Sequence, residues 1–224
     1  MDNLPNIEIK SNDRVMVCGR TGSGKSVLVN RLILPKMTNY VVYDYKHEFD
    51  FPGAEVFTSL GDFRQRPDRR AVIYRTATGS DEEFDGLCRQ VFFRGNNTLV
   101  LDEIANHCDA RRIMPHHDLI MRLGRSKGVG VINCTQRPRG LHNNVVSQCE
   151  HFFIFDLTQD TDRKKLAEFC GDEVMTRARD FHFWYYNIRA ESPVLCRPVK
   201  LGAPIAAPAV SNDKPNAPGG DAGR

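Results

Sequence analysis

The octapeptide Gly19–Ser26, GRTGSGKS, constrains the fold of this chain more than any other feature, because it is a complete phosphate-binding loop of the pattern G-x-x-x-x-G-K-S/T. It follows a short apolar run, Arg14–Cys18, and opens a predicted helix, Ser26–Leu34. Glycines let the backbone N–H groups of such a loop converge on phosphate oxygens, and the positive end of the following helix adds to the attraction. Lys25 would contribute a mobile charge and Ser26 a hydroxyl ligand for Mg²⁺. The sequence therefore predicts a nucleotide site formed by Gly19, Arg20, Thr21, Gly22, Ser23, Gly24, Lys25 and Ser26.

Length and composition narrow the class of protein. With 224 residues, the chain can form one domain of ordinary size with a full core. It contains no run of 18 apolar residues and begins without a signal-peptide pattern, so we predict neither a signal peptide nor a transmembrane segment. Seven cysteines without a C-x-x-C pair indicate reduced thiols in a cytosol-like compartment.

Apolar runs alternate with helical patterns along the chain. This alternation predicts an α/β fold with a mostly parallel sheet and helices on both faces. Together with the phosphate-binding loop, the pattern resembles P-loop NTPases of the RecA/ASCE-like kind. The predicted strands are Arg14–Cys18, Tyr40–Asp44, Ala71–Thr76, Thr98–Asp102, Val129–Cys134 and His151–Asp156, followed by a final pair at Phe181–Ile188 and Pro193–Val199. The predicted helices are Ser26–Leu34, Asp81–Arg94, His116–Lys127 and Asp160–Phe169. Residues 1–200 would form the ordered domain, and 201–224, rich in Ala, Pro and Gly, a flexible tail.

A second motif supplies the acidic partner that a phosphate-binding loop needs. The segment Thr98–Glu103, TLVLDE, is an apolar strand that ends in two carboxylates. Asp102 would hold Mg²⁺, and Glu103 would polarise a water aimed at the γ-phosphate. The adjacent acid favours a hydrolysing ATPase over a small-molecule kinase or a GTPase, and no guanine-reading N-K-x-D motif occurs. The alternative is an ordinary Asp–Glu helix cap after a strand.

A third polar position follows the apolar strand Val129–Cys134. This strand should lie beside the strand that carries Asp102, which would bring Gln136 close to the γ-phosphate, where it could sense whether the phosphate is present. Alternatively, Gln136 is an ordinary polar residue at the end of a strand and has no sensor role.

These segments together resemble the FtsK/HerA superfamily of DNA-pumping ATPases over residues 12–190. The T-Q-R-P sequence at 135–138, after an R-x-x-G turn, is the most specific mark, and Asp44–Phe49 (DYKHEF) and Asp156–Leu166 (DLTQDTDRKKL) resemble further superfamily segments. The resemblance implies that an arginine before the sensor strand reaches a neighbouring subunit's ATP site. Arg125 matches this position, with Arg122 and Arg163 as alternatives.

The chain carries little besides the motor core, as do the genome-packaging ATPases of tailless, membrane-containing double-stranded DNA viruses. The resemblance implies an Mg²⁺-dependent ATPase that forms a hexameric or pentameric ring, translocates double-stranded DNA into a preformed capsid, docks on capsid or vertex proteins, and acts in the host cytoplasm or the virion. The alternatives are a plasmid or conjugative translocase, a filamentous-phage assembly ATPase, and a non-hydrolysing nucleotide switch that recruits partners. An excess of arginine, 22 against 9 lysines, suits phosphate contacts but also fits codon bias. The basic segments Arg64–Arg70 and Arg111-Arg112 are candidate DNA contacts or solvated loops.

Overall fold

A computed structural model describes residues 7–65 and 70–200, and within them nine strands form one sheet in the order β3-β4-β2-β5-β6-β1-β7-β8-β9. Strands β1 to β7 pair in parallel, whereas β8 and β9 are antiparallel to their neighbours. The strand bounds are β1 Arg14–Cys18, β2 Tyr40–Tyr43, β3 Glu55–Phe57, β4 Ala71–Tyr74, β5 Asn97–Leu101, β6 Val129–Thr135, β7 His151–Ile154, β8 Phe183–Asn187 and β9 Val194–Cys196.

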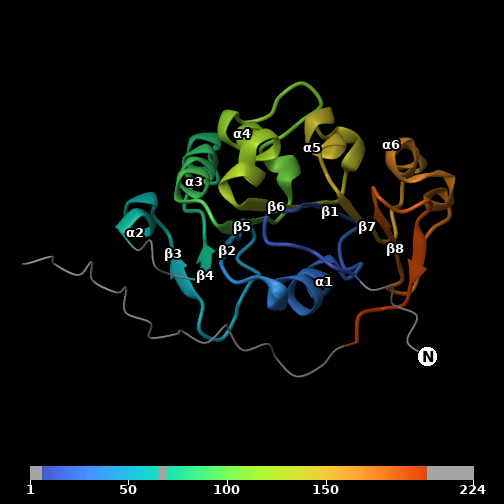
Figure 1. The fold of residues 1–224 in the computed structure, drawn as a ribbon, viewed down its shortest axis with the longest axis horizontal. Coiled ribbons are helices and arrows are strands. Elements are labelled where there is room, and N and C mark those ends of the chain that lie inside the picture. The colour runs from blue at the N-terminus through green and yellow to red at the C-terminus, as the bar shows by residue number, and fades with distance from the viewer. Residues whose placement is uncertain (1–6, 66–69, 201–224) are drawn as a thin grey trace, which may run out of the picture.

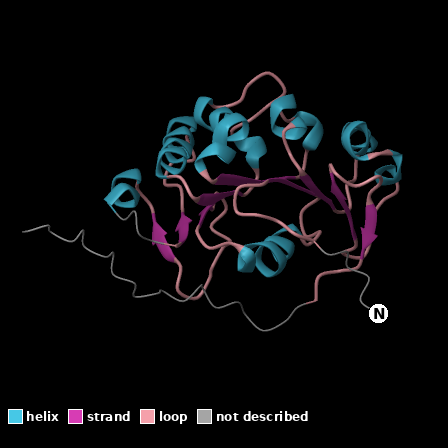
Figure 2. Ribbon diagram, viewed as in Figure 1, coloured by secondary structure: helices cyan, strands magenta, loops and turns pink. Residues whose placement is uncertain are grey.

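Helices cover both faces of this sheet, but unequally. Figure 1 shows α3, α4, α5 and α6 on one face and α1 on the other, while Figure 2 shows the strands as a single layer between them. The bounds are α1 Lys25–Leu28, α2 Leu60–Gln65, α3 Asp81–Arg94, α4 Pro115–Leu123, α5 Asn143–Ser147 and α6 Asp160–Cys170. Short 3₁₀ turns lie at Leu34–Lys36, Ile104–Asn106, Gly124–Lys127, Pro138–Gly140 and Asp172–Met175, and Val29–Ile33 is π-helical.

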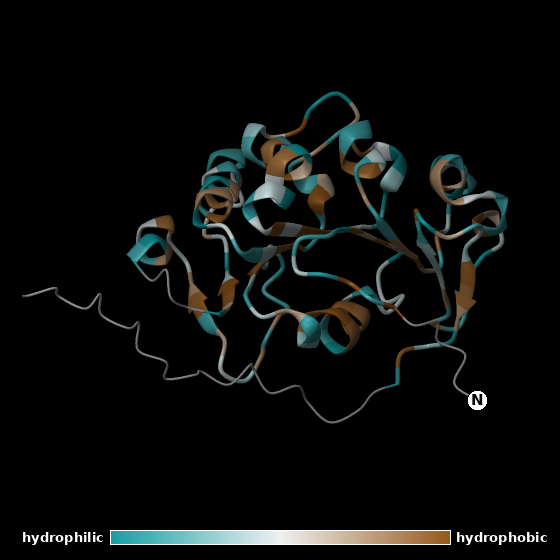
Figure 3. Ribbon diagram, in the orientation of Figure 1, coloured by the Kyte–Doolittle hydropathy of each residue, from teal (hydrophilic) through white to brown (hydrophobic). Residues whose placement is uncertain are grey.

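The core consists of two apolar layers, one on each face of the sheet. Side chains alternate along a strand, so Val15 and Val17 of β1 enter the layer under α1, whereas Met16 and Cys18 enter the layer under α3 to α6. All four side chains are fully buried, and Figure 3 shows the corresponding concentration of apolar residues along the strands. Because both faces are covered, the central strands are continuous apolar runs, which is the pattern that the sequence presented.

The structure confirms the predicted fold class and most of the predicted elements. Sequence analysis missed β3, α2 and α5, which are only three to six residues long. The predicted helix Ser26–Leu34 is present, but its α-helical part ends at Leu28 and the π-helical segment continues it. All seven cysteines are free and buried. Within the described residues, no helix is long and apolar enough to span a bilayer. The predicted tail, 201–224, lies outside the described residues.

Helix α3 begins after the N-cap residue Ser80, and Glu83 in its first turn fixes the end of β4. The Ser80 hydroxyl accepts a hydrogen bond from the Glu83 backbone N–H at 3.2 Å. The Glu83 carboxylate in turn accepts hydrogen bonds from Tyr74, Thr76 and Thr78 at 2.6–2.8 Å. Burial opposes the charge on Glu83, but these donors outweigh it and lower its pKa to about 2.

We expect Glu83→Gln to destabilise the protein in a pH-dependent way. A folded pKa below the unfolded value of 4.5 stabilises the fold above pH 4.5, and this contribution is lost as the pH falls toward 2. Glu83→Gln should therefore lower the free energy of unfolding at pH 7 by about 2–3 kcal/mol, and by less at pH 3.5. Urea unfolding at both pH values measures this, with the exposed neighbour substitution Glu82→Gln as the control. An equal loss at both pH values would contradict the account.

Candidate nucleotide site

The site lies at the edge of the sheet where the parallel strands end. Strand β6 pairs with β1 on one side and with β5 on the other, in register Cys18↔Thr135 and Leu101↔Asn133. The loop after β1, the acid pair after β5 and Gln136 after β6 therefore emerge side by side. The carboxyl edge of a parallel sheet is where ligands bind in α/β folds of this kind.

The phosphate-binding loop has the backbone conformation that the motif predicts. Gly22 and Gly24 adopt left-handed conformations, with φ of 71° and 106°. Gly19 is closely packed, because a Cβ atom there would lie 2.5 Å from Ser23 Oγ and 2.6 Å from Phe155 Cβ. Lys25 Nζ closes the loop by donating to the carbonyl oxygens of Gly19, at 2.7 Å, and Arg20, at 3.1 Å.

Asp102 is a buried carboxylate with unused bonding capacity. Its side chain is 6% exposed, and burial raises its pKa to about 6. Its Oδ2 lies 4.0 Å from Lys46 Nζ and has no hydrogen-bond partner among the described residues. A buried carboxylate oxygen of this kind fits a divalent cation, and together with the exposed Ser26 hydroxyl it provides the hard oxygen ligands that Mg²⁺ prefers.

Glu103 is held in an uncommon backbone conformation by the neighbouring strand. Its φ of 60° is rare for a residue with a side chain, and such conformations cluster at functional sites. One carboxylate oxygen accepts hydrogen bonds from Thr135 Oγ1 at 3.0 Å and from the Gln136 backbone N–H at 3.2 Å. The other oxygen is buried and has no hydrogen-bond partner among the described residues. Strand β6 thus fixes the orientation of Glu103 and leaves one oxygen free to accept a proton.

Gln136 contacts the phosphate-binding loop directly. Its Oε1 accepts a hydrogen bond from Thr21 Oγ1 at 2.8 Å. Its backbone N–H bonds Glu103, so Gln136 links the loop after β1 to the acid pair after β5. The structure thereby brings together the three predicted parts of the site, and their chemical roles remain predictions.

Arg125 lies at the opposite edge of the sheet from these residues. It belongs to the turn Gly124–Lys127 that precedes β6, whereas Gln136 follows β6, and a strand of seven residues spans about 23 Å. Arg125 therefore cannot reach the phosphate-binding loop of its own subunit. Its guanidinium is half exposed and bonds Glu150 Oε1 at 2.6 Å, while Arg14 Nε lies 3.5 Å from the other Glu150 oxygen.

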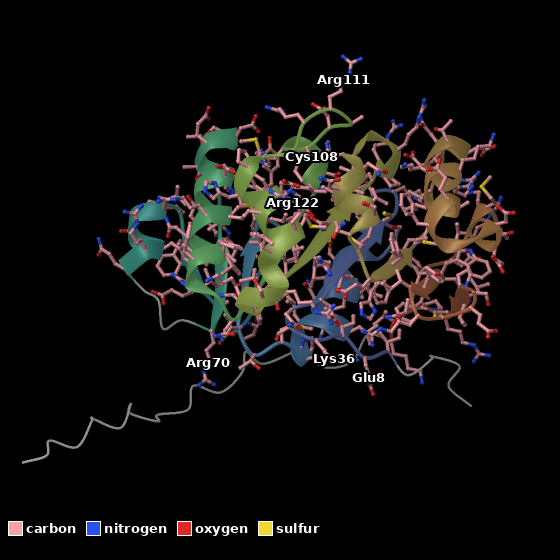
Figure 4. The ribbon with its side chains drawn as sticks, turned by 45° about the horizontal axis from the view of Figure 1, so that its top comes forward. Glu8, Lys36, Arg70, Cys108, Arg111 and Arg122 are labelled. Carbon is pink, nitrogen blue, oxygen red and sulfur yellow. The ribbon has the colours of Figure 1, made fainter. Side chains whose placement is uncertain are left out.

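The two alternative arginines have different environments. Arg122 is exposed on α4, where Figure 4 labels it, and its Nε lies 2.8 Å from Asp118 Oδ2. Arg163 is buried and bonds the Leu157 carbonyl and Asp160 of its own subunit, so its position does not support a contact with a neighbour. Of the candidate DNA contacts, Arg111 is exposed and projects outward from its loop in Figure 4. Residues 66–69 lie outside the described residues.

The segment Asp44–Phe49 resembles a superfamily segment, but the sequence pattern assigned no role to its residues. Asp44 is fully buried and accepts hydrogen bonds from the backbone N–H groups of Glu48 and Phe49, at 2.9 and 3.2 Å. This turn directs Lys46 toward Asp102 and places Glu48 beside the phosphate-binding loop. The acid–x–Lys–x–acid spacing, which resembles the superfamily segment, was the available signal for these residues.

Asp156, two residues after β7, is a second residue to which the sequence pattern assigned no role. Its carboxylate accepts hydrogen bonds from Arg20 Nε at 3.0 Å and from Arg177 at 2.7 and 2.8 Å. The Arg177 guanidinium holds the pKa of this carboxyl below its usual value. Asp156 therefore ties the phosphate-binding loop to the segment that precedes β8.

Comparisons with known proteins agree with this geometry. No protein-family model matches the chain. The DNA packaging ATPase P9 of Enterobacteria phage PRD1 is 22% identical over 212 residues, which cover 87% of this chain and 90% of that protein. Protein P9 of Pseudoalteromonas phage PM2 is 23% identical over 158 residues, covering 68% of this chain and 72% of that protein.

Solved structures show the same fold. The genome packaging NTPase B204 from Sulfolobus turreted icosahedral virus 2, in complex with ATP-gammaS, superposes with a TM-score of 0.73 at 21% identity, over 86% of this chain and all of that one. The chain is therefore homologous to the P9 proteins of the two phages and has the fold of B204. These comparisons confirm the predicted resemblance to genome-packaging ATPases of viruses.

Proposed function

We propose that this chain is the ATPase subunit of a viral genome-packaging motor, which hydrolyses ATP to translocate double-stranded DNA into a preformed capsid. One observation carries the proposal. The phosphate-binding loop, the acid pair and Gln136 meet at one sheet edge, in a chain homologous over most of its length to a DNA packaging ATPase. The fold alone would not distinguish a motor from another P-loop protein, whereas this set of side chains is the one that hydrolysis requires.

The roles of the site residues follow from their positions. The backbone N–H groups of the loop and Lys25 hold the β- and γ-phosphates of ATP. Ser26 and Asp102 would hold Mg²⁺, which when bound neutralises charge on the phosphate oxygens. Glu103, oriented by Thr135 and the Gln136 N–H, accepts a proton from the attacking water through its free oxygen. Gln136, bonded to Thr21, would detect the γ-phosphate through that contact.

The opposite edge of the sheet supports assembly into a ring. If subunits associate head to tail, an edge that carries Arg125 meets the nucleotide edge of the next subunit. Arg125 would then stabilise the charge that develops on the transferred phosphoryl group, a contribution on the order of 10³–10⁵ in rate. Hydrolysis would thereby depend on assembly of a homo-oligomeric ring of five or six subunits. Docking on capsid or vertex proteins, with action in the host cytoplasm or the virion, is part of the same proposal.

We expect Lys25 and Glu103 to fail in different ways when substituted. Lys25→Ala removes a phosphate contact, so ATP binding and turnover should both be lost. Glu103→Gln retains an oxygen for its two hydrogen-bond donors but cannot accept the proton, so ATP affinity should remain while turnover falls about 10²–10⁴-fold. Calorimetry and phosphate release measure the two quantities, with the exposed Lys164→Ala as a control. Near-normal turnover of Glu103→Gln would remove Glu103 from the mechanism.

Duplex DNA should stimulate ATP turnover by the assembled protein. A motor that holds DNA through its phosphates should bind duplexes with little sequence preference. Its affinity should fall steeply as the salt concentration rises, because the release of condensed counterions on binding is less favourable at high salt. Turnover would be measured against the concentration of two unrelated duplexes of equal length, at two salt concentrations. Turnover that is indifferent to both duplexes in assembled protein would contradict the translocase function and leave a DNA-independent ATPase.

A further inference from the structure

An apolar cavity of about 460 Å³ adjoins the phosphate-binding loop, and the motifs discussed so far do not account for it. One end is formed by the loop and the start of its helix, from Gly22 to Val27, together with the exposed Glu48, whose charge acts on Asp102. The far end is formed by Phe155, Phe181, Pro198 and Val199, which come from the end of β7, the turn before β8 and the chain after β9. The charged side chains of the lining, Lys25 and Glu48, therefore lie at the end where phosphates bind, and the four residues of the far end have no polar side chain.

Phe181 is the notable member of this wall. Its side chain is 60% exposed, although Phe155 and Phe183 beside it are buried. A Cβ atom at Gly24 would lie 3.6 Å from Phe181 Cδ1 and 3.3 Å from Phe155 Cε1, so both rings lie against the loop. An exposed aromatic ring next to a phosphate site presents a flat apolar face to a ligand bound there.

The backbone that presents Phe181 is strained and anchored. Asp180 and Phe181 both adopt left-handed conformations, with φ of 53° and 60°, which is uncommon for residues with side chains and more so for an aromatic one. Such strain persists only where surrounding contacts impose it. Here Arg177 is tied through Asp156 to Arg20 of the phosphate-binding loop, and the Trp184 indole N–H donates to the Thr176 carbonyl at 2.8 Å.

We propose that this cavity is the nucleobase pocket of the site and that Phe181 stacks on a purine ring. The inference rests on the proposed function and names the base-recognition element of the same site. Four side chains of the far end have no group that could form a hydrogen bond with the edge of the base: Phe155, Phe181, Pro198 and Val199. The pocket therefore recognises the flat face of an aromatic base and not its polar edge. It accepts adenine and guanine nucleotides alike, since strong discrimination between related ligands requires buried polar partners.

The test compares ligands with and without a base. ATP, GTP and inorganic tripolyphosphate, each with Mg²⁺, are titrated calorimetrically into the intact protein and into Phe181→Ala. We expect ATP and GTP to bind within about tenfold of each other, since an apolar pocket discriminates weakly. Phe181→Ala should weaken both nucleotides by roughly tenfold, the scale of one lost stacking contact, and leave tripolyphosphate unchanged. Phe181→Trp, which keeps a stacking face, should retain the affinity for both nucleotides.

The controls separate this inference from the function on which it rests. Phe93, exposed on α3 at the other face of the sheet, provides the matched substitution Phe93→Ala, which should change none of the affinities. Equal weakening of all three ligands by Phe181→Ala, or no weakening of ATP, would overturn the stacking role, even if DNA-stimulated turnover persists. A preference for ATP over GTP far above tenfold would overturn the claim of base tolerance. Failure of the intact protein to bind any of the three ligands would instead contradict the proposed function.

Discussion

The adjacency of β5, β6 and β1 as parallel strands is the constraint on which the site depends. Parallel pairing brings their carboxyl ends to one edge, and β6 in the middle position joins the two outer parts. Thr135 and Gln136 of this strand end bond Glu103 on one side, and Gln136 bonds Thr21 on the other. A shift of β6 by one residue would move its side chains to the opposite faces of the sheet and break all three contacts. The register of the sheet therefore determines the geometry of the site.

The site contains a buried charged residue, Asp102, and a residue with a strained backbone, Glu103. Asp102 is buried with one oxygen unbonded, which raises its pKa to about 6, and Glu103 has a left-handed backbone. Neither feature helps a folded chain by itself, since burial of a carboxylate and a left-handed backbone both oppose folding. Burial of the two apolar layers that cover the sheet stabilises the fold and offsets the cost of these features. Departures of this kind from an otherwise consistent fold are expected at functional sites.

The sequence allowed prediction of those parts of the site whose functional residues lie within one short motif beside an apolar strand. The phosphate-binding loop, the acid pair after an apolar strand and the adjacent sensor strand are each recognisable within a few residues. The short edge strand β3 and helices α2 and α5 are too brief to show a hydrophobic period. Lys46 and Phe181 were missed for another reason. Their relation to the site depends on loop conformations, fixed in one case by the buried Asp44 and in the other by Asp156. The spacing of Asp44, Lys46 and Glu48 marks the first loop without giving its conformation, and no motif marks the second.

We propose that each nucleotide site is shared between subunits. Arg125 and the phosphate-binding loop occupy opposite edges of one sheet, so Arg125 could act only on the loop of a neighbouring subunit. The most direct test of this proposal mixes Arg125→Ala subunits with Lys25→Ala subunits, each of which should be inactive alone. In mixed rings some interfaces pair an intact loop with an intact Arg125, so the account predicts that ATP turnover partly returns, with a maximum near equal amounts. Native mass spectrometry would establish that the rings are mixed. If demonstrably mixed rings hydrolyse no ATP at any ratio, Arg125 does not act on a neighbouring site.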